Sequence, residues 1–563
     1  MNGFFSRSLR RLFTGWPLRW QPGLPLFAFM LLNASCGSGP PDSEGMTVFR
    51  YNEDQNITSL DPVYARNQAN IWAVSQLYNS LLELDDSLRV RPAIAKRWEL
   101  SEDGLTYTFF LRDDVYFHDN ECFPEGKGRR VVADDFIFSF SRLLDPRLSA
   151  PGAWVMNQVA RKENGELHME APDDTTLVIH MAQPFPPMPG LLTMQYCAVV
   201  PHEAIEAYGQ DFRRNPVGTG PFRFAYWREG VRLVYRKNPN YFEFEGGQRL
   251  PYLDAVSISF IVDRQAAFLE FIRGNLDVLT RVDASYQDEL LTPRGELQEK
   301  YRDQIQMISM PFLNSEYLGF QLDGERVPPD WPARSRKVRQ AVNYGFDREK
   351  MLTFLRNNIG TPAHAGFVPL GVPGFNANEG GYYYDPDKAR QLLAEAGYPG
   401  GEGLPDITLH TTQAYQDIAQ YIQFELERIG IRLRISVNPP ATHREKMANA
   451  AAPFFRGSWI ADYPDAENYL ALFYSRNRTP AGPNYTRFSN TQFDSLYEAA
   501  LSETNDSIRI GMYRQMDSIV IAEAPKVFLY YDQSMRFAQD HVKNLSNNPL
   551  NHLELKRVSI DSE

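Results

Sequence analysis

Apolar residues follow two different periods along this chain. They occupy every second position in 105–112 and again in 256–262, which is typical of strands with one buried face. Spacings of three and four residues predict helices at 264–274, 334–346, 385–397 and 418–429. An alternating strand at 431–437 follows the last helix after a single glycine. This alternation of helices and strands predicts a mixed α/β fold.

The N-terminus has the features of an export signal. Four arginines precede an apolar run at 23–34, and this run of about 12 residues is shorter than the about 20 that span a bilayer. Cys36 follows the small residues Ala34 and Ser35, as in the lipobox of bacterial lipoproteins. We therefore expect a signal peptide at 1–35 and a lipid on Cys36. The alternative is that Cys36 is an ordinary residue near the cleavage site.

The segment after Cys36 differs from the rest of the chain. Residues 36–45 are rich in Gly, Ser and Pro and carry few apolar side chains, which predicts a flexible tether. No other apolar run is long enough to cross a membrane. A globular body tethered at the extracytoplasmic face of the cell envelope is the expected product.

Composition and charge exclude several classes of protein. The 563 residues include 58 Lys and Arg against 70 Asp and Glu, a net charge of −12, which argues against nucleic-acid binding. The sequence has no G-x-S-x-G elbow, no P-loop and no H-E-x-x-H motif, so we expect no catalytic residues. Its nine His show no metal-ligand spacing along the chain, and neither a metal site nor a cofactor is expected.

Two cysteines remain beside Cys36. Cys122 and Cys197 could form a disulfide outside the cytoplasm, or both could be free thiols in the interior. The sequence leaves both possibilities open, because it does not place the two within bridging distance.

One aromatic and acidic segment, 456–469, contains the candidate binding residues. An acid at Asp462 between Trp459 and Tyr463 could pair with a ligand ammonium group, since a desolvated carboxylate favours a cation. Arg456 could meet a ligand carboxylate with its planar guanidinium. The alternative is structural: Asp462 as a loop cap and Trp459 as a core residue.

Many segments resemble, in order, the family 5 extracellular solute-binding proteins, the peptide-binding and nickel-binding receptors of bacterial ABC importers. The similarity extends from Met46 onward and is carried by these stretches: LDPVYARNQANIWAVSQLYNSLLELD, VRPAIAKRWELSEDGLTYTFFLRDDVYFHDN, VVADDFIFSFSRLLDP, NPVGTGPFRF and DPDKARQLLAEAGYPGG. The resemblance implies a periplasmic-binding-protein-like fold of two lobes with a hinge and an additional domain. Its divisions would be lobe I at 46–80, 205–310 and 530–563, domain II at 81–204, and lobe III at 311–529.

The same resemblance implies roles for the candidate residues. Asp462 would pair with the α-ammonium of a short peptide, Trp459 and Tyr463 would line the cavity, and the backbone of Ser458 would pair with the peptide backbone. Arg456 matches a position that faces the ligand carboxylate in some members. The expected function is a non-catalytic, monomeric receptor that delivers peptides to an ABC permease and ATPase complex.

Three alternatives stay open at this point. The same fold could bind another solute, such as a nickel chelate or a sugar, because members of the family share one framework. An enzyme or chaperone on this scaffold is a second possibility. The third is a signalling subunit of the envelope that has no transporter.

Overall fold

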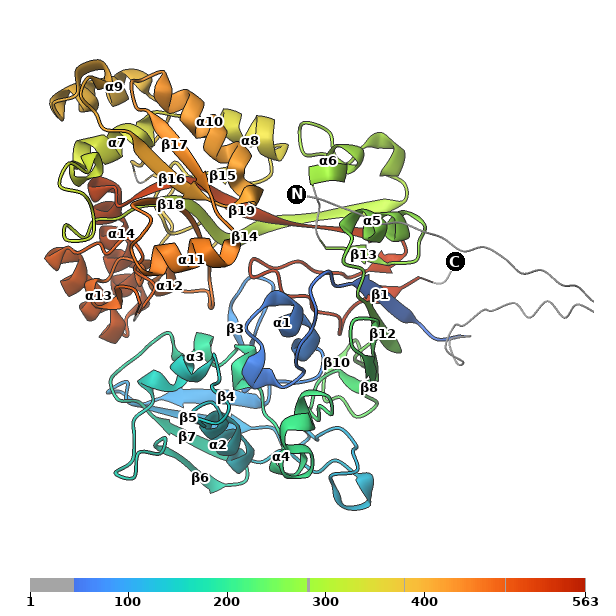
Figure 1. The fold of residues 1–563 in the computed structure, drawn as a ribbon. Helices are drawn as coiled ribbons and strands as arrows, with labels where there is room; N and C mark the ends of the chain where they lie inside the picture. Colours follow the sequence, from blue (N-terminus) through green and yellow to red (C-terminus); the bar gives the residue numbers. More distant parts are fainter. Residues whose placement is uncertain (1–44, 281–283, 379, 481, 562–563) are drawn as a thin grey trace, which may run out of the picture. The chain divides into compact units, whose positions relative to one another are not determined.

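The computed structural model describes residues 45–280, 284–378, 380–480 and 482–561 (Figure 1). The expected signal peptide, Cys36 and all of the expected tether except Gly45 lie outside these residues. The chain divides after Gly45, and every helix and strand below belongs to the unit that begins at Met46. Within the described ranges, no helix combines the length and the apolar character needed to cross a membrane.

One large mixed sheet forms the centre of this unit, with eleven strands in the described part of the chain. Ten of them follow one another in space as β17 (Leu433–Val437), β16 (Ile407–Thr411), β18 (Phe454–Ile460), β14 (Ile305–Phe320), β19 (Lys526–Gln539), β13 (Val278–Leu279), β1 (Val48–Asn52), β12 (Ala255–Ser259), β9 (Arg232–Lys237) and β8 (Phe222–Arg228). The short β15 (Thr361–Pro362) pairs with β19 beside this path.

The two longest strands, β14 and β19, join the two halves of this sheet. They run antiparallel to each other. The C-terminal end of β19 pairs with β13, and the C-terminal half of β14 pairs with β18. Their register shifts between Pro311 and Ser315, where a regular ladder would continue. The expected boundary between 310 and 311 falls at this shift. The division into three domains stays a prediction.

A second sheet of four antiparallel strands lies apart from the first and comes from the expected domain II (Figure 1). Its order is β4 (Ala95–Leu100), β5 (Thr106–Leu111), β7 (Thr176–His180) and β6 (Met169–Asp173). Alternation is clear in β5, where Tyr107, Phe109 and Leu111 are buried under α2 (Ala133–Arg142) and the residues between them face outward. Three two-stranded pairs complete the sheets: β2 (Leu82–Leu84) with β3 (Val90–Pro92), β10 (Phe244–Glu245) with β11 (Gln248–Arg249), and β20 (Val542–Lys543) with β21 (Ser559–Ile560).

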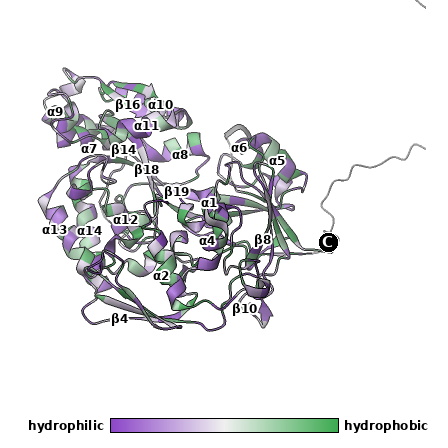
Figure 2. Cartoon of the chain, turned by 60° about the horizontal axis from the view of Figure 1, so that its bottom comes forward, coloured by the Kyte–Doolittle hydropathy of each residue, from purple (hydrophilic) through white to green (hydrophobic). Residues whose placement is uncertain are grey.

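The helices pack on both sheets and on one another. Besides α2 they are α1 (Gln68–Ser75), α3 (Met188–Leu191), α4 (His202–Tyr208), α5 (Arg264–Ile272), α6 (Ala284–Leu290), α7 (Arg336–Tyr344), α8 (Arg348–Arg356), α9 (Pro386–Glu395), α10 (Gln416–Glu427), α11 (Pro440–Ala448), α12 (Glu467–Leu470), α13 (Thr491–Ser502) and α14 (Asp506–Glu523). Hydrophilic and hydrophobic residues both occur along them, as expected of elements with one buried and one solvated face (Figure 2).

The elements expected from periodicity are confirmed with small shifts at their ends. The helix expected at 385–397 is α9, where the Asp385 side chain caps the Lys388 N–H. The helix expected at 418–429 is α10, and the alternating strand after it is β17. The mixed α/β class is therefore confirmed.

The interior of the first half of the chain is continuous. One hydrophobic cluster joins residues of the expected lobe I and domain II, and includes the fully buried Trp72 of α1. The Trp72 indole N–H donates to the carbonyl oxygen of Asn551 at 2.8 Å, so α1 is tied to the C-terminal segment. Cys122 and Cys197 are both free, which decides between the two possibilities left open by the sequence.

Candidate functional site

The second half of β18 has one open edge. β14 pairs with β18 along its whole length, whereas β16 pairs only with its first two residues. The Ala461 N–H donates to β14 at 2.9 Å, while the Arg456 carbonyl oxygen faces the other side and lies 2.8 Å from His443 Nε2. Because backbone groups alternate along a strand, the N–H and C=O of Ser458 point toward the open edge. An extended ligand would find one donor and one acceptor there.

Asn468 forms hydrogen bonds with Trp459 in β18 and with Asp462 just after this strand. Its buried Oδ1 accepts from the Trp459 indole N–H at 2.8 Å and from the Asp462 backbone N–H at 3.2 Å. Its Nδ2 lies 3.5 Å from Asp462 Oδ2, too far for a strong hydrogen bond. Asn468 belongs to α12, so this short helix positions both the aromatic ring and the acid.

Asp462 combines solvent access with desolvation. Its side chain is exposed, yet desolvation by the surrounding protein raises the pKa of Asp462, and the hydrogen bond from Asn468 offsets only part of that rise. A group that reaches water while closely surrounded by protein lies in a recess of the surface. Among the described residues no Lys, Arg or His forms an ion pair with it. The site therefore holds a carboxylate without a counter-cation.

Tyr463 is placed differently from its neighbour. Its ring is only 4% exposed and packs against Trp154 of the expected domain II, with ring centroids 6.5 Å apart. Its hydroxyl donates to Glu467, which also accepts from Tyr497. Burial raises the pKa of Glu467 to about 6, against the lowering effect of these two hydrogen bonds. Tyr463 is therefore buried, with its hydroxyl paired inside the protein, and its predicted place on the cavity wall stays a prediction.

Arg456 is already paired within the protein. Its Nη2 lies 2.5 Å from Glu316 Oε2, and its guanidinium stacks 3.3 Å from the centroid of the Tyr415 ring. Burial raises the pKa of Glu316, and the Arg456 charge opposes that rise. The Glu316 carboxylate also accepts from Asn314, which in turn donates to Asp532. This network neutralises the Arg456 charge before any ligand arrives.

Tyr196 lies near the acid and Arg66 lies near Tyr196, and both come from parts of the chain far from 456–469. Burial raises the pKa of Tyr196 to about 12, the Asp462 carboxylate adds to this rise, and the Arg66 guanidinium opposes it. Both charges therefore lie close enough to the Tyr196 hydroxyl to act on it. Arg66 is exposed and forms no ion pair among the described residues. Sequence reasoning missed both residues, because nothing along the chain links them to Asp462.

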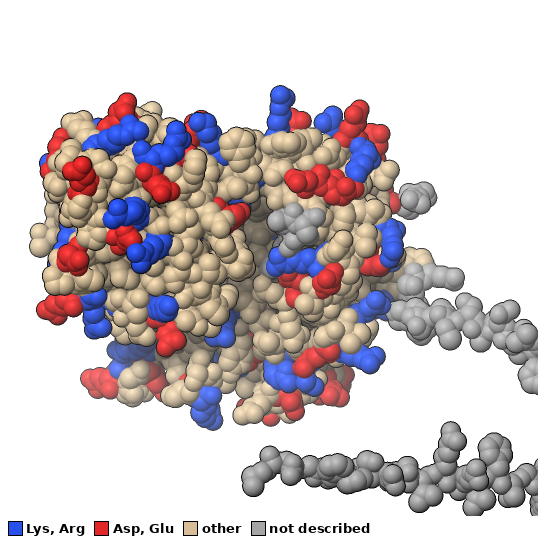
Figure 3. Space-filling view, turned by 45° about the horizontal axis from the view of Figure 1, so that its top comes forward, with Lys and Arg blue, Asp and Glu red and all other residues tan. Residues whose placement is uncertain are grey.

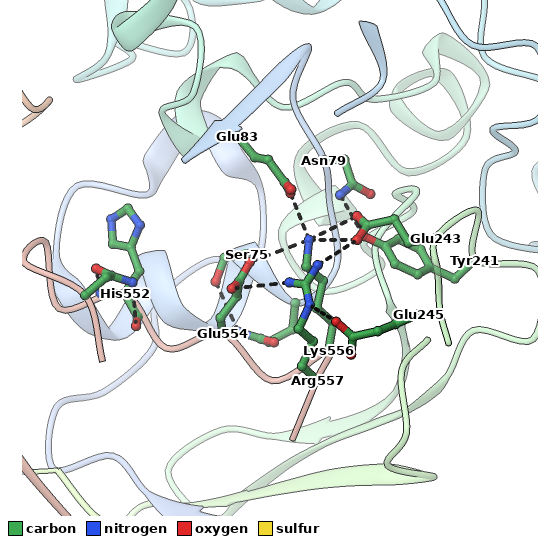
Figure 4. A network of polar contacts seen from close by, with 12 residues as sticks. Ser75, Asn79, Glu83, Tyr241, Glu243, Glu245, His552, Glu554, Lys556 and Arg557 are labelled. Atoms are coloured by element: carbon green, nitrogen blue, oxygen red, sulfur yellow. Dashed lines mark hydrogen bonds and ion pairs between the residues drawn. The ribbon is translucent and has the colours of Figure 1, made fainter. Parts of the chain in front are cut away.

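A polar cavity lies between α1, β2 and the C-terminal segment, and Figure 4 shows the network of polar contacts beside it. The buried Lys556 ammonium is the centre of the network. It lies 2.9 Å from a Glu83 oxygen and 3.0 Å from a Glu243 oxygen. Although burial acts to lower it, the pKa of Lys556 is raised well above its ordinary value by Tyr241 and the acids around it. The Arg557 guanidinium lies 3.1 Å from a Glu245 oxygen in the same network. These ion pairs join three distant segments, so the network stabilises the fold and offers no free cation.

The surface is hollowed between the region that carries α7 to α10 and the region that carries α5 and α6 (Figure 3). These two regions belong to the two halves of the large sheet, and among the described strands only β14 and β19 connect those halves. Ligands of two-lobed proteins bind in such hollows, where closure of the lobes can exclude water.

Comparison with known proteins agrees with this architecture. The family model for bacterial extracellular solute-binding proteins, family 5, matches residues 89–480. The chain is 27% identical over 503 residues to heme-binding protein A of Haemophilus influenzae, with 87% of each protein covered. It is 24% identical over 499 residues to the dipeptide-binding protein of Escherichia coli K12, covering 86% of this chain and 89% of that one.

The fold is also similar to solved structures. The dipeptide-binding protein of Pseudoalteromonas sp. SM9913, in complex with Met-Leu, superposes with a TM-score of 0.73 at 23% identity. The match covers 91% of this chain and 100% of that one, and at 23% identity it shows a similarity of fold only. Together with the family model, which matches more than half of the sequence, these findings identify the chain as a member of the bacterial extracellular solute-binding proteins, family 5.

Proposed function

We propose that this protein is the receptor of an ABC importer and that it captures short peptides with a free N-terminus. The observation that carries the proposal is the carboxylate of Asp462, which is partly desolvated and has no cationic partner among the described residues. A ligand ammonium group would relieve the cost of that unpaired charge. The dipeptide-binding and dipeptide-bound relatives support this choice of cargo.

The open edge of β18 supports recognition that does not depend on the peptide sequence. With its ammonium group on Asp462, an extended peptide would exchange hydrogen bonds with the backbone N–H and C=O of Ser458. Main-chain pairing of this kind gives affinity for many sequences. The ring of Trp459, fixed by Asn468, would contact the first side chains.

Arg66 is our candidate for the ligand carboxylate. Arg456, expected from the sequence for this role, is neutralised by Glu316, whereas Arg66 is exposed and acts on the same tyrosine as Asp462. A guanidinium without a partner suits a peptide C-terminus. We propose that Arg456 and Tyr463 stabilise the shape of the site and do not contact the ligand.

The remaining parts of the proposal concern delivery. We propose that the chain is exported, cleaved before Cys36 and held at the membrane by a lipid on that residue, with the body free to reach a permease and ATPase complex as a monomer. Membership of an extracellular solute-binding family supports this placement. A single globular unit from Met46 onward is consistent with a tethered receptor.

The test is to identify the cargo of the protein purified from a peptide-rich host. Native mass spectrometry followed by denaturation should release a set of short peptides with free N-termini. A heme, as the name of one relative suggests, would add a strong visible absorption band and would overturn the peptide assignment. Release of a metal chelate or a sugar would do the same while leaving the importer role intact.

Two variants and one matched control locate the site. Asp462→Asn should weaken peptide binding by at least about thirtyfold, since loss of one partner of a desolvated charge pair costs about 2–5 kcal/mol. Asp387→Asn, at a side chain that is 93% exposed, is the control and should bind normally. Arg66→Ala should weaken peptides with a free carboxylate but not C-terminal amides. Normal binding by Asp462→Asn would contradict the proposed site.

A further inference from the structure

Three potential metal ligands meet on the outer face of the four-stranded sheet. His168 directly precedes β6, Glu170 lies two positions along on the same face, and His180 ends β7. The pairing of Met169 with Ile179 sets His168 directly opposite His180, and the His180 N–H donates to the His168 carbonyl oxygen at 3.1 Å. Strand pairing therefore brings together residues whose spacing along the chain resembles no metal motif.

The separations between the ligand atoms fit a tetrahedral metal ion. Nε2 of His168 lies 3.3 Å from Glu170 Oε1, and Nε2 of His180 lies 3.5 Å from the same oxygen. Bonds of about 2.0–2.1 Å to Zn²⁺ place two tetrahedral ligands about 3.3–3.4 Å apart. The three ligand atoms all lie within 4.8 Å of one another. Small side-chain movements would suffice to enclose an ion.

The surroundings of His180 also favour a metal. Its Nδ1 lies 3.3 Å from the Thr106 hydroxyl oxygen, which can accept a hydrogen bond from an Nδ1–H group. This tautomer leaves a lone pair on Nε2, and Nε2 is buried with no hydrogen-bond partner among the described residues. Metal-bound histidines commonly give their second nitrogen to such an acceptor, which fixes the ring.

The two imidazole rings are close to each other, with centroids 4.0 Å apart and planes tilted by 32°. Hydrogen bonding accounts for only part of the arrangement: His168 Nε2 is within hydrogen-bond range of Glu170 Oε1 at 3.3 Å, whereas His180 Nε2, 3.5 Å from the same oxygen, has no hydrogen-bond partner among the described residues.

We propose that His168, Glu170 and His180 bind a divalent transition-metal ion on the expected domain II, with Zn²⁺ the best fit. Two imidazole nitrogens and one carboxylate oxygen are donors that Zn²⁺ accepts readily. The three side chains are 38%, 55% and 27% exposed, so an ion can enter and water can complete its coordination. The site is independent of the proposed peptide cleft, and its test does not depend on the cargo.

The experiment is a Zn²⁺ titration of the full chain, purified without a histidine tag and stripped with a chelator, against a chromogenic competitor. We expect one ion per chain. Loss of a residue that only orients a metal ligand weakens metal affinity about 10–100-fold. His168→Ala and His180→Ala each remove a ligand, so each should weaken Zn²⁺ affinity by more than that. Thr106→Val, which removes the positioning hydroxyl, should weaken it within that range.

The matched control is His364→Ala. Nε2 of His364 lies 3.6 Å from a Glu349 oxygen, so this variant removes a similar pair that lacks a third ligand, and the Zn²⁺ affinity should not change. Zinc-edge absorption spectroscopy should show two imidazole ligands and no sulfur. Absence of binding at 1:1 stoichiometry, sulfur in the spectrum, or full affinity in both His168→Ala and His180→Ala would overturn the proposal. An unchanged melting temperature of the metal-free protein verifies that each variant is folded.

Discussion

Asp462 and Glu467 lie five positions apart, and desolvation raises the pKa of both, yet their surroundings differ. Both oxygens of Glu467 accept from tyrosine hydroxyls, so its burial is compensated inside the protein. Asp462 has only the long contact from Asn468. Two acids of one segment therefore have separate roles: Glu467 supports the fold, and Asp462 is available to a ligand.

The raised pKa of Asp462 predicts how peptide affinity depends on pH. The ionised form binds an ammonium group, and binding lowers the pKa, so affinity is complete above the pKa of the free protein and falls as pH drops through it. An ordinary aspartate has a pKa of about 4. Because desolvation raises the pKa of Asp462, the loss of peptide affinity should begin at a higher pH than it would for such an aspartate. Calorimetric titrations from pH 7.5 to 4 would measure this, and the residual binding of Asp462→Asn should show no such step.

Lys526 predicts a change in stability away from the site. Its ammonium is fully buried, Nζ has no hydrogen-bond partner among the described residues, and it lies 3.9 Å from the ring centroids of Tyr317 and Phe367. Burial lowers the pKa of Lys526 well below its ordinary value. Lys526→Met should raise the free energy of unfolding at pH 7 by about 1–3 kcal/mol, the usual cost of a buried polar group in proteins.

The pH dependence separates this explanation from simple repacking. Between its lowered pKa and about 10.4, the native protein binds fewer protons at Lys526 than the unfolded chain, so wild-type stability rises with pH. The advantage of Lys526→Met in urea denaturation should therefore shrink from pH 7 to pH 10. A constant difference over that range would contradict a lowered pKa of Lys526 in the native protein.

At the scale of the element, the open edge of β18 predicts sensitivity to the ligand backbone. If Ser458 pairs with an extended peptide, N-methylation of the internal amide that meets it removes a donor and should weaken binding by about 2–10-fold, since one hydrogen bond contributes about 0.5–1.5 kcal/mol. A scan of singly N-methylated tripeptides would show one sensitive position. Equal affinity for all of them would exclude strand-like recognition at this edge.

The sequence predicted the elements better than the site. Strand β5 and helix α9 follow from local periodicity and capping, which require no knowledge of distant residues. Asp462 and Trp459 could be proposed as binding residues because both lie in one short segment of the sequence, and their roles stay a prediction. The pairing of Arg456 with Glu316 spans 140 positions and was not visible, since only the alignment of β14 with β18 brings the two together.

At the scale of the whole unit, β14 and β19 are the only strands of the large sheet, among the described residues, that link its two halves. Two strands with a shifted register bend more easily than a wide sheet, which makes them the expected hinge. A ligand held between the halves would shift the balance toward the closed form by binding that form better.

The contact of Tyr463 with Trp154 predicts that residues outside the ligand site control this balance. It joins the expected lobe III to the expected domain II, so it forms only when they approach. Trp154→Ala should destabilise the closed form by about 1 kcal/mol, the typical energy of an aromatic pair, and weaken peptide binding about fivefold, although Trp154 does not contact the ligand.

X-ray scattering of this variant should show a larger radius of gyration than the wild type at subsaturating peptide, and the same radius of gyration as the closed wild type at saturation. Leu100→Ala, at an exposed position of β4 in the same expected domain II, is the control. Unchanged affinity in Trp154→Ala would mean that this contact does not contribute to closure.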